Sequence, residues 1–199
     1  MNIGSLFSRH AKYSPDHLAI VFGEQRLTHE QFNRSINRLA NALQALGVQK
    51  GDHIATILPN SLELLETFWA CAKIGAVVVP LSMLLLEKAM KSLLQDSNSA
   101  LVISNYSFAD MLDNIKKDLP AIAPDRYLLT DVSDRRGYQD YHGLKAVAND
   151  GEPHAILVTD HDPFNIMYSS GTTGLPKGIV HTHYIRAMYA TIFAGSYRM

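Results

Sequence analysis

The chain has 199 residues, of which 47% are hydrophobic and 19% are charged, with a formal net charge of −1. This length and composition fit a soluble globular protein with one sizeable core. The near-zero net charge supplies no basic field for nucleic acid or anionic lipid, so we expect no nucleic-acid partner.

Single features argue against an internal disulfide or a catalytic cysteine, a signal peptide and a membrane-spanning segment. The one cysteine, Cys71, cannot form an internal disulfide and lies in an apolar helical pattern without a catalytic motif, so we expect it in the core. Charged residues within positions 9–16 interrupt any signal peptide. The longest uncharged apolar run, between Lys73 and Glu87, is split by Pro80 and too short to span a bilayer. We therefore expect a cytoplasmic protein without a transmembrane segment.

The first half of the chain alternates helical and strand-like patterns. We expect a helix over residues 1–12, a hairpin of residues 18–22 and 25–27, a helix over 28–46, a strand over 54–58, a helix capped by Asn60 or Ser61 and ended by Gly75, and a strand over 76–79. In the longest helix, Thr28 and Gln31 have the spacing of a capping box. Its apolar residues recur at helical spacing, which predicts burial of Phe32, Ile36, Leu39 and Leu43.

The alternation continues into the second half. We expect helices over residues 87–95 and 108–119, strands over 100–103 and 126–129, a surface segment over 131–162 with one short helix near 141–148, and a strand over 164–167. Strands that alternate with helices indicate right-handed βαβ units. The fold class is therefore α/β, with a mainly parallel sheet and helices on both faces.

One stretch near the C-terminal end, YSSGTTGLPKG over residues 168–178, is predicted to be a loop between regular elements. It holds three glycines, four Ser or Thr residues and one lysine. Glycines let backbone N–H groups approach a ligand, and successive N–H groups in such a turn form an anion-binding concavity. The hydroxyls add donors and Lys177 adds a positive charge, so the set suits a polyphosphate.

The spacing within this stretch excludes two familiar phosphate loops. A Walker loop places a Gly-Lys-Ser/Thr triplet after four residues, whereas Gly171 and Gly174 are three apart and Gly178 follows Lys177. The Gly-x-Gly-x-x-Gly spacing of dinucleotide-binding proteins is also absent. The alternative is a Gly/Ser-rich hairpin turn without a ligand. A defined order of Ser, Thr, Gly, Pro and Lys over eleven positions is difficult to reach by chance, so we favour the ligand-binding interpretation.

Residues 170–178 resemble the signature loop of the adenylate-forming, or AMP-binding, superfamily. That group includes acyl-CoA synthetases, peptide-synthetase adenylation domains and firefly luciferase. Ser169 departs from the commoner threonine but keeps the hydroxyl. Segments similar to other family blocks occur upstream in the family's order, at residues 27–32, 47–52, 58–61 and 73–81. The likeness covers roughly residues 5–104 and 162–195, and acyl-CoA synthetases are the most similar members.

The resemblance implies a two-step reaction with ATP, Mg²⁺ and coenzyme A. A carboxylic acid, by likeness to acyl-CoA synthetases a fatty acid, would form an acyl-adenylate and then a CoA thioester. In the family, this loop is flexible and closes over the nucleotide phosphates. The positions that would bind the phosphates are Ser169, Ser170, Gly171, Thr172, Thr173, Gly174, Lys177 and Gly178. Thr173 and Lys177 would act on the leaving pyrophosphate, and no residue is assigned as a metal ligand.

Other family features have no counterpart among the 199 residues. These are the acyl pocket, the adenine segment, the magnesium-binding acid, the ribose-binding aspartate and the C-terminal lysine. We therefore expect residues 1–199 to be the N-terminal portion of an AMP-binding domain, truncated after the phosphate loop and inactive alone.

Two alternatives remain: an aryl-acid or amino-acid adenylation domain, and a non-catalytic truncated product. A homodimer is left open. Thr182 or His183 is expected to begin a helix, in preference to a metal pair of His181 and His183.

Overall fold

The chain forms a small hairpin and one large sheet in this computed structural model, which describes residues 2–131, 134–169 and 176–197. The hairpin pairs β1 (Leu18–Phe22) with β2 (Gln25–Thr28). In the described residues the large sheet has seven strands in the order β7-β6-β5-β3-β4-β8-β9. They are β3 (His53–Ile57), β4 (Val77–Pro80), β5 (Ser99–Ser104), β6 (Tyr127–Leu129), β7 (Gln139–Asp140), β8 (Pro163–Ser169) and β9 (Lys177–Thr182). All neighbours pair in parallel except β8 and β9, which confirms the mainly parallel sheet.

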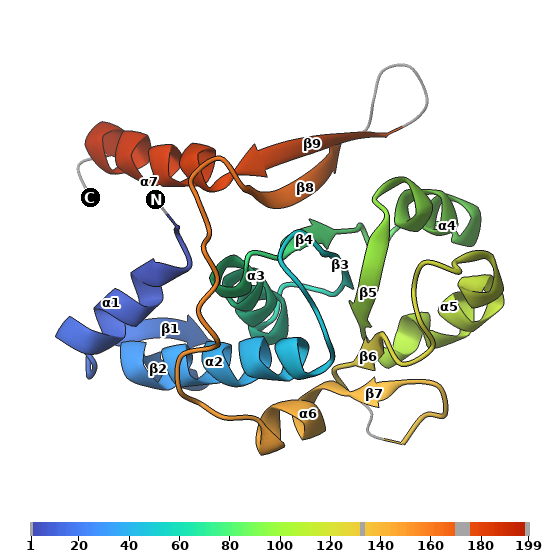
Figure 1. Cartoon of the computed structure of the whole chain (residues 1–199), viewed down its shortest axis with the longest axis horizontal. Helices are drawn as coiled ribbons and strands as arrows, with labels where there is room; N and C mark the ends of the chain where they lie inside the picture. The colour runs from blue at the N-terminus through green and yellow to red at the C-terminus, as the bar shows by residue number, and fades with distance from the viewer. Residues whose placement is uncertain (1, 132–133, 170–175, 198–199) are drawn as a thin grey trace.

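Helices cover both faces of this sheet, as predicted. They are α1 (Ser5–Tyr13), α2 (His29–Ala45), α3 (Leu62–Ile74), α4 (Glu87–Asp96), α5 (Ala109–Ile115), α6 (Tyr141–Val147) and α7 (His183–Tyr197). Figure 1 shows α2 and α3 on one side of the sheet and α4 and α5 on the other. Among the helices that the structure describes, none is both long and apolar enough to cross a bilayer.

The start of α2 confirms the capping box. The Thr28 hydroxyl accepts a hydrogen bond from the Gln31 backbone N–H at 3.3 Å, and the Gln31 side chain accepts from the Thr28 N–H at 3.0 Å. These bonds satisfy two backbone donors that a helix start otherwise leaves unpaired. The predicted apolar stripe of α2 is buried to within 1% exposure, and its members are Phe32, Ile36, Leu39 and Leu43.

The central strands are apolar on both faces because each face packs against a helical layer. In β4, Val78 points into the cluster formed with α2 and α3, while Val77 and Val79 point into the cluster formed with α4 and α5. Cys71 of α3 lies in the first cluster with no exposed surface, which confirms its predicted place in the core. Burial of this kind contributes about 1.5–3 kcal/mol for each large side chain.

Two predicted helices were too long, and one short strand was not predicted. The expected helix over 108–119 is three pieces, because α5 is flanked by 3₁₀ turns η1 (Tyr106–Phe108) and η2 (Lys116–Asp118). The Tyr106 N–H is bound by the Asp131 carboxylate at 2.7 Å, and Pro120 disfavours helical geometry in the residue before it. The expected helix over 1–12 begins only at Ser5, and β7 was not predicted because two residues show no periodicity.

A segment that we call the strap, residues 148–162, joins α6 to β8 and runs along α2 (Figure 1). Amide side chains one turn apart on α2 bind its backbone. Asn37 donates to the Asp150 carbonyl at 2.9 Å, and Asn41 donates to the carbonyls of Asn149 and Gly151 at 2.8 and 2.9 Å. Because residues i and i+4 lie on one helix face, a single row of asparagines fixes the extended strap.

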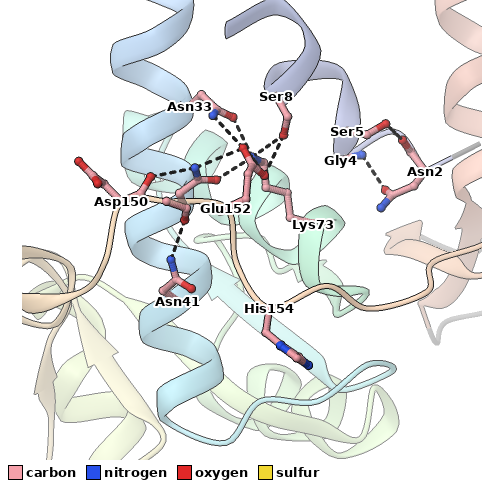
Figure 2. Close-up of polar contacts among 12 residues, drawn as sticks. Asn2, Gly4, Ser5, Ser8, Asn33, Asn41, Lys73, Asp150, Glu152 and His154 are labelled. Atoms are coloured by element: carbon pink, nitrogen blue, oxygen red, sulfur yellow. Dashed lines mark hydrogen bonds and ion pairs between the residues drawn. The ribbon is translucent and has the colours of Figure 1, made fainter. Parts of the chain in front are cut away.

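A buried lysine fixes the strap to three helices (Figure 2). The Lys73 ammonium donates to Asn33 at 2.7 Å, to Ser8 at 2.8 Å and to the Glu152 carboxylate at 2.8 Å. Burial lowers the pKa of Lys73, and the hydrogen bond and charge of Glu152 only partly oppose that shift. These contacts join α1, α2 and α3 to the strap that leads into β8.

Candidate nucleotide-phosphate site

The glycine-rich stretch belongs to a β-hairpin at one side of the sheet. Its first arm, β8, pairs in parallel with β4 through Asn165 and Val78. Its second arm, β9, pairs antiparallel with β8 from Ser169 and Lys177 back toward the sheet. The segment between the arms therefore follows the carboxyl end of a strand that is parallel to its neighbour. In open α/β sheets, ligands bind outside this edge.

The predicted loop over residues 168–178 was too long. Tyr168 and Ser169 end β8, while Lys177 and Gly178 begin β9, so strand pairing extends further than glycine content suggested. The arms thus have the geometry of a hairpin, which was the alternative interpretation. A hairpin does not exclude phosphate binding, because successive backbone N–H groups in turns are known to form anion-binding concavities.

Three of the predicted site residues are placed by the structure. Ser169 and Lys177 are cross-strand partners with exposed side chains, and Gly178 follows on β9. The remaining predicted residues lie outside the described residues, and so does most of the segment expected to be flexible: Ser170, Gly171, Thr172, Thr173 and Gly174. The structure therefore brings one hydroxyl and one ammonium group together where the two arms part.

The end of β8 nearest the glycine-rich run holds a residue that the sequence did not single out. The Tyr168 hydroxyl donates to the Asp96 carboxylate at 2.5 Å, which links β8 to the last residue of α4. Burial raises the pKa of the Tyr168 phenol, and the hydrogen bond and charge of Asp96 raise it further. The phenol therefore remains a donor at neutral pH. An aromatic residue directly before the Ser/Gly-rich run was the one available signal.

A cavity of about 270 Å³ lies beside this end of the hairpin. The last residue of β4, Pro80, and the segment after it, with Leu81, Ser82 and Leu85, contribute to its wall. The hairpin contributes Tyr168, Ser169 and Pro176, and α4 contributes Leu93. The ends of β4 and β8 therefore meet at one edge of the sheet, next to the residues expected to bind phosphate.

The two histidines after the hairpin have separate environments. His181 of β9 contacts the Asn165 side chain at 3.2 Å, whereas His183 begins α7, as predicted, and is fully buried. The Nδ1 atom of His183 accepts a hydrogen bond from the Ile3 N–H at 3.3 Å. In the described part of the chain, no group of three or more His, Cys, Asp and Glu side chains is arranged to hold a metal ion.

Comparison with known proteins agrees with this geometry. The AMP-binding enzyme family matches residues 7–198. The chain belongs to the AMP-binding enzyme family. It is 38% identical over 186 residues to the long-chain-fatty-acid–CoA ligase FadD13 of Mycobacterium tuberculosis, covering 92% of this chain and 35% of that protein. It is 35% identical over 181 residues to a feruloyl-CoA synthase of Amycolatopsis, covering 91% of this chain and 33% of the relative.

The fold of the family is recovered as well. The crystal structure of the anthranilate CoA ligase AuaEII in complex with anthranoyl-AMP superposes with a TM-score of 0.90 at 24% identity, over 98% of this chain and 37% of that one. At this identity the likeness establishes the α/β fold alone. The chain spans about a third of the length of the relatives it matches.

Proposed function

We propose that this chain carries the pyrophosphate-binding part of an ATP-dependent acid–thiol ligase. The complete activity would convert a carboxylic acid first to an acyl-adenylate and then to an acyl-CoA thioester. Residues 1–199 would form the N-terminal portion of its AMP-binding domain. ATP and coenzyme A are cytoplasmic substrates, so we place the activity in the cytoplasm.

One observation carries this proposal. The stretch that resembles the family's signature loop leaves the sheet at the carboxyl edge of β8, and Ser169 faces Lys177 where the two arms part. This edge is where open α/β sheets bind their ligands. An exposed ammonium and hydroxyl at that point supply charge and hydrogen-bond donors to a phosphate.

The residues of the stretch would act on the departing pyrophosphate. The substrate carboxylate attacks the α-phosphorus, the bond from that phosphorus to the bridging oxygen breaks, and pyrophosphate leaves with the electron pair. The hydroxyls of Ser169, Ser170, Thr172 and Thr173, with the N–H groups of Gly171 and Gly174, would hold its oxygens. Lys177 would neutralise part of the charge that develops there. Gly178 would leave its position on the arm without a side chain. Fixed donors aimed at developing charge are the usual source of such rate enhancement.

The donor set fits ATP better than it fits a free metal ion. Hydroxyl, N–H and ammonium groups bind phosphate oxygens, whereas Mg²⁺ prefers carboxylate and water oxygens. Mg²⁺ would therefore bind together with the phosphates. It would neutralise the part of their negative charge that Lys177 does not. Coenzyme A supplies the thiol that displaces AMP in the second step. We assign no residue of this chain as its ligand.

We propose a fatty acid as the substrate, supported by the 38% identity to a long-chain-fatty-acid–CoA ligase. An aryl acid is the second candidate, supported by the 35% identity to a feruloyl-CoA synthase. The two differ in the shape of the acyl group, which the phosphate-binding residues do not contact. Phosphate binding would be the same for both.

Carboxylate-dependent ATP–pyrophosphate exchange tests the proposal. The protein made from the complete reading frame that contains this chain is assayed with fatty, aryl and amino acids in parallel. We expect exchange, and CoA thioester formation, with fatty acids. Exchange only with ferulate-like acids would favour the aryl-acid ligase. Nucleotide binding without exchange for any acid would contradict a ligase and favour a non-catalytic product.

A further inference from the structure

Within the hairpin, Tyr168 of β8 and Gly178 of β9 are cross-strand partners. A Cβ atom at position 178 would lie 3.5 Å from two Tyr168 ring atoms and 3.0 Å from the Ile166 side chain. The Tyr168 ring therefore lies against the glycine across the neighbouring strand, at ordinary contact distance, and the tighter approach is that of Ile166. Aromatic residues opposite glycine are a known means of pinning strand register.

The hydroxyl of the same ring reaches a different layer of the fold. It donates to the Asp96 carboxylate at 2.5 Å, and Asp96 is the last residue of α4. That helix is held firmly, because Met90, Leu93 and Leu94 are buried in the core beneath it. One side chain thus joins the hairpin, through its ring, to a helix that the core holds in place.

We infer that Tyr168 is a positioning residue for the phosphate-binding hairpin, with Asp96 as its partner. The ring and the hydrogen bond together set the direction in which β8 and β9 leave the sheet. This inference rests on the proposed function for its catalytic consequence. When the hairpin is already oriented, less of the free energy of phosphate binding is offset by the cost of ordering its arms.

Three substitutions isolate the hydrogen bond. Tyr168→Phe keeps the ring against Gly178 and removes the donor. Asp96→Ala removes the acceptor, whereas Asp96→Asn keeps an amide oxygen that can accept from the phenol. Tyr13→Phe, at a tyrosine that is 71% exposed on α1, is the matched control for loss of a hydroxyl.

Amide hydrogen exchange in the complete protein tests the structural part without any assay of activity. In Tyr168→Phe and Asp96→Ala we expect the amides of β8 and β9 to exchange about tenfold faster, the size of one hydrogen bond to a charged group. Amides of β3 and β5 should keep their wild-type rates. Asp96→Asn keeps a weaker, uncharged acceptor, so its rates should lie between those of wild type and Asp96→Ala. Tyr13→Phe should match wild type. Unchanged exchange in β9, or equal acceleration in β3, would overturn the positioning role.

Kinetics of the complete protein tests the catalytic part. Tyr168→Phe and Asp96→Ala should each lower kcat/KM for ATP about tenfold, and the double variant should lose no more than either single one. The KM for the carboxylate and the thioester step should be unchanged. Additive losses in the double variant, or a raised carboxylate KM, would contradict the inference. Wild-type protein without ATP–pyrophosphate exchange would refute the proposed function instead, and the hydrogen-exchange result would still decide the positioning role of Tyr168.

Discussion

The Nζ atom of Lys73 lies 2.8 Å from Oε2 of Glu152, and only 3% of the lysine side chain is exposed. The carboxylate is half-exposed, so the pair has one desolvated and one hydrated member. A buried ammonium is stable only when it is paired and hydrogen-bonded. This pair therefore holds the strap against α2 and α3. Without the Glu152 carboxylate, the Lys73 charge would be buried without its anion.

Glu152→Gln should lower the free energy of unfolding by about 2–3 kcal/mol, because it leaves the Lys73 charge buried without its anion. Lys73→Met combined with Glu152→Gln should recover part of that loss, since no buried charge remains. Urea unfolding followed by far-ultraviolet circular dichroism measures both. Glu30→Gln is the matched control, because Glu30 pairs with Arg34 on an exposed helix face and should change stability by less than about 0.5 kcal/mol. A Glu152→Gln variant as stable as this control would contradict the buried-charge account.

Stability should fall in mild acid because of His183. Burial lowers the pKa of His183 to about 4, although the Asp162 carboxylate opposes that shift. The unfolded chain binds a proton here below pH about 6.5, and the folded chain only below about 4. The free energy of unfolding therefore decreases as pH falls from about 6.5 to about 4, by on the order of 2–3 kcal/mol.

His183→Asn provides the comparison, because its amide oxygen can still accept from the Ile3 N–H. At each pH, we compare the free energies of unfolding of wild type and variant. The contribution of carboxylates such as Glu152 is common to both proteins and cancels in the difference. We expect this difference to shrink or reverse between pH 7 and pH 5. An identical pH dependence in the two proteins would rule out His183 as the titrating group.

The cysteine should be inert in the folded protein. Cys71 has no exposed surface, and burial raises the pKa of its thiol far above the ordinary value. Both effects suppress the thiolate that attacks disulfide reagents. In native buffer a chromogenic disulfide reagent should release almost no colour, whereas in denaturant it should report one thiol per chain. Rapid labelling in native buffer would show that α3 separates readily from the core.

Much of the fold could be predicted because its signals are local. The period of Phe32, Ile36 and Leu39, the Thr28 cap and the valine run of β4 each depend on neighbours within a few residues. Boundaries failed where distant groups decide them. The Tyr106 N–H is held by Asp131, 25 positions along the chain, and no local pattern reports that contact.

The candidate site divides in the same way. The proposed phosphate-binding residues are read from one continuous stretch, and the order of residues from Ser169 to Gly178 carries that information. The contacts that support this stretch could not be read from the sequence in the same way, because their partners are far apart in the chain. Tyr168 binds Asp96 across 72 positions, and Lys73 binds Glu152 across 79. Hairpin pairing also extended into the glycine-rich run, since Tyr168 covers Gly178 and compensates for its missing side chain.

The role of the phosphate-binding residues is tested by Thr173→Ala and Lys177→Ala in the complete protein. Removing a donor aimed at developing charge costs about 2–4 kcal/mol, or roughly a hundred- to a thousandfold in rate. We expect a loss of that size for Thr173→Ala. Lys177→Ala should lose less, because its side chain is exposed to water, which screens the charge.

The most direct measurement is carboxylate-dependent ATP–pyrophosphate exchange by wild type and Thr173→Ala, with thioester formation from supplied acyl-adenylate measured beside it. The account predicts that exchange falls at least about a hundredfold in the variant, while the thioester step stays within a few-fold, because pyrophosphate has already left. It also predicts no exchange from the isolated 199-residue chain. Wild-type exchange in Thr173→Ala would contradict the role assigned to the glycine-rich stretch, and exchange by the isolated chain would contradict its dependence on further segments.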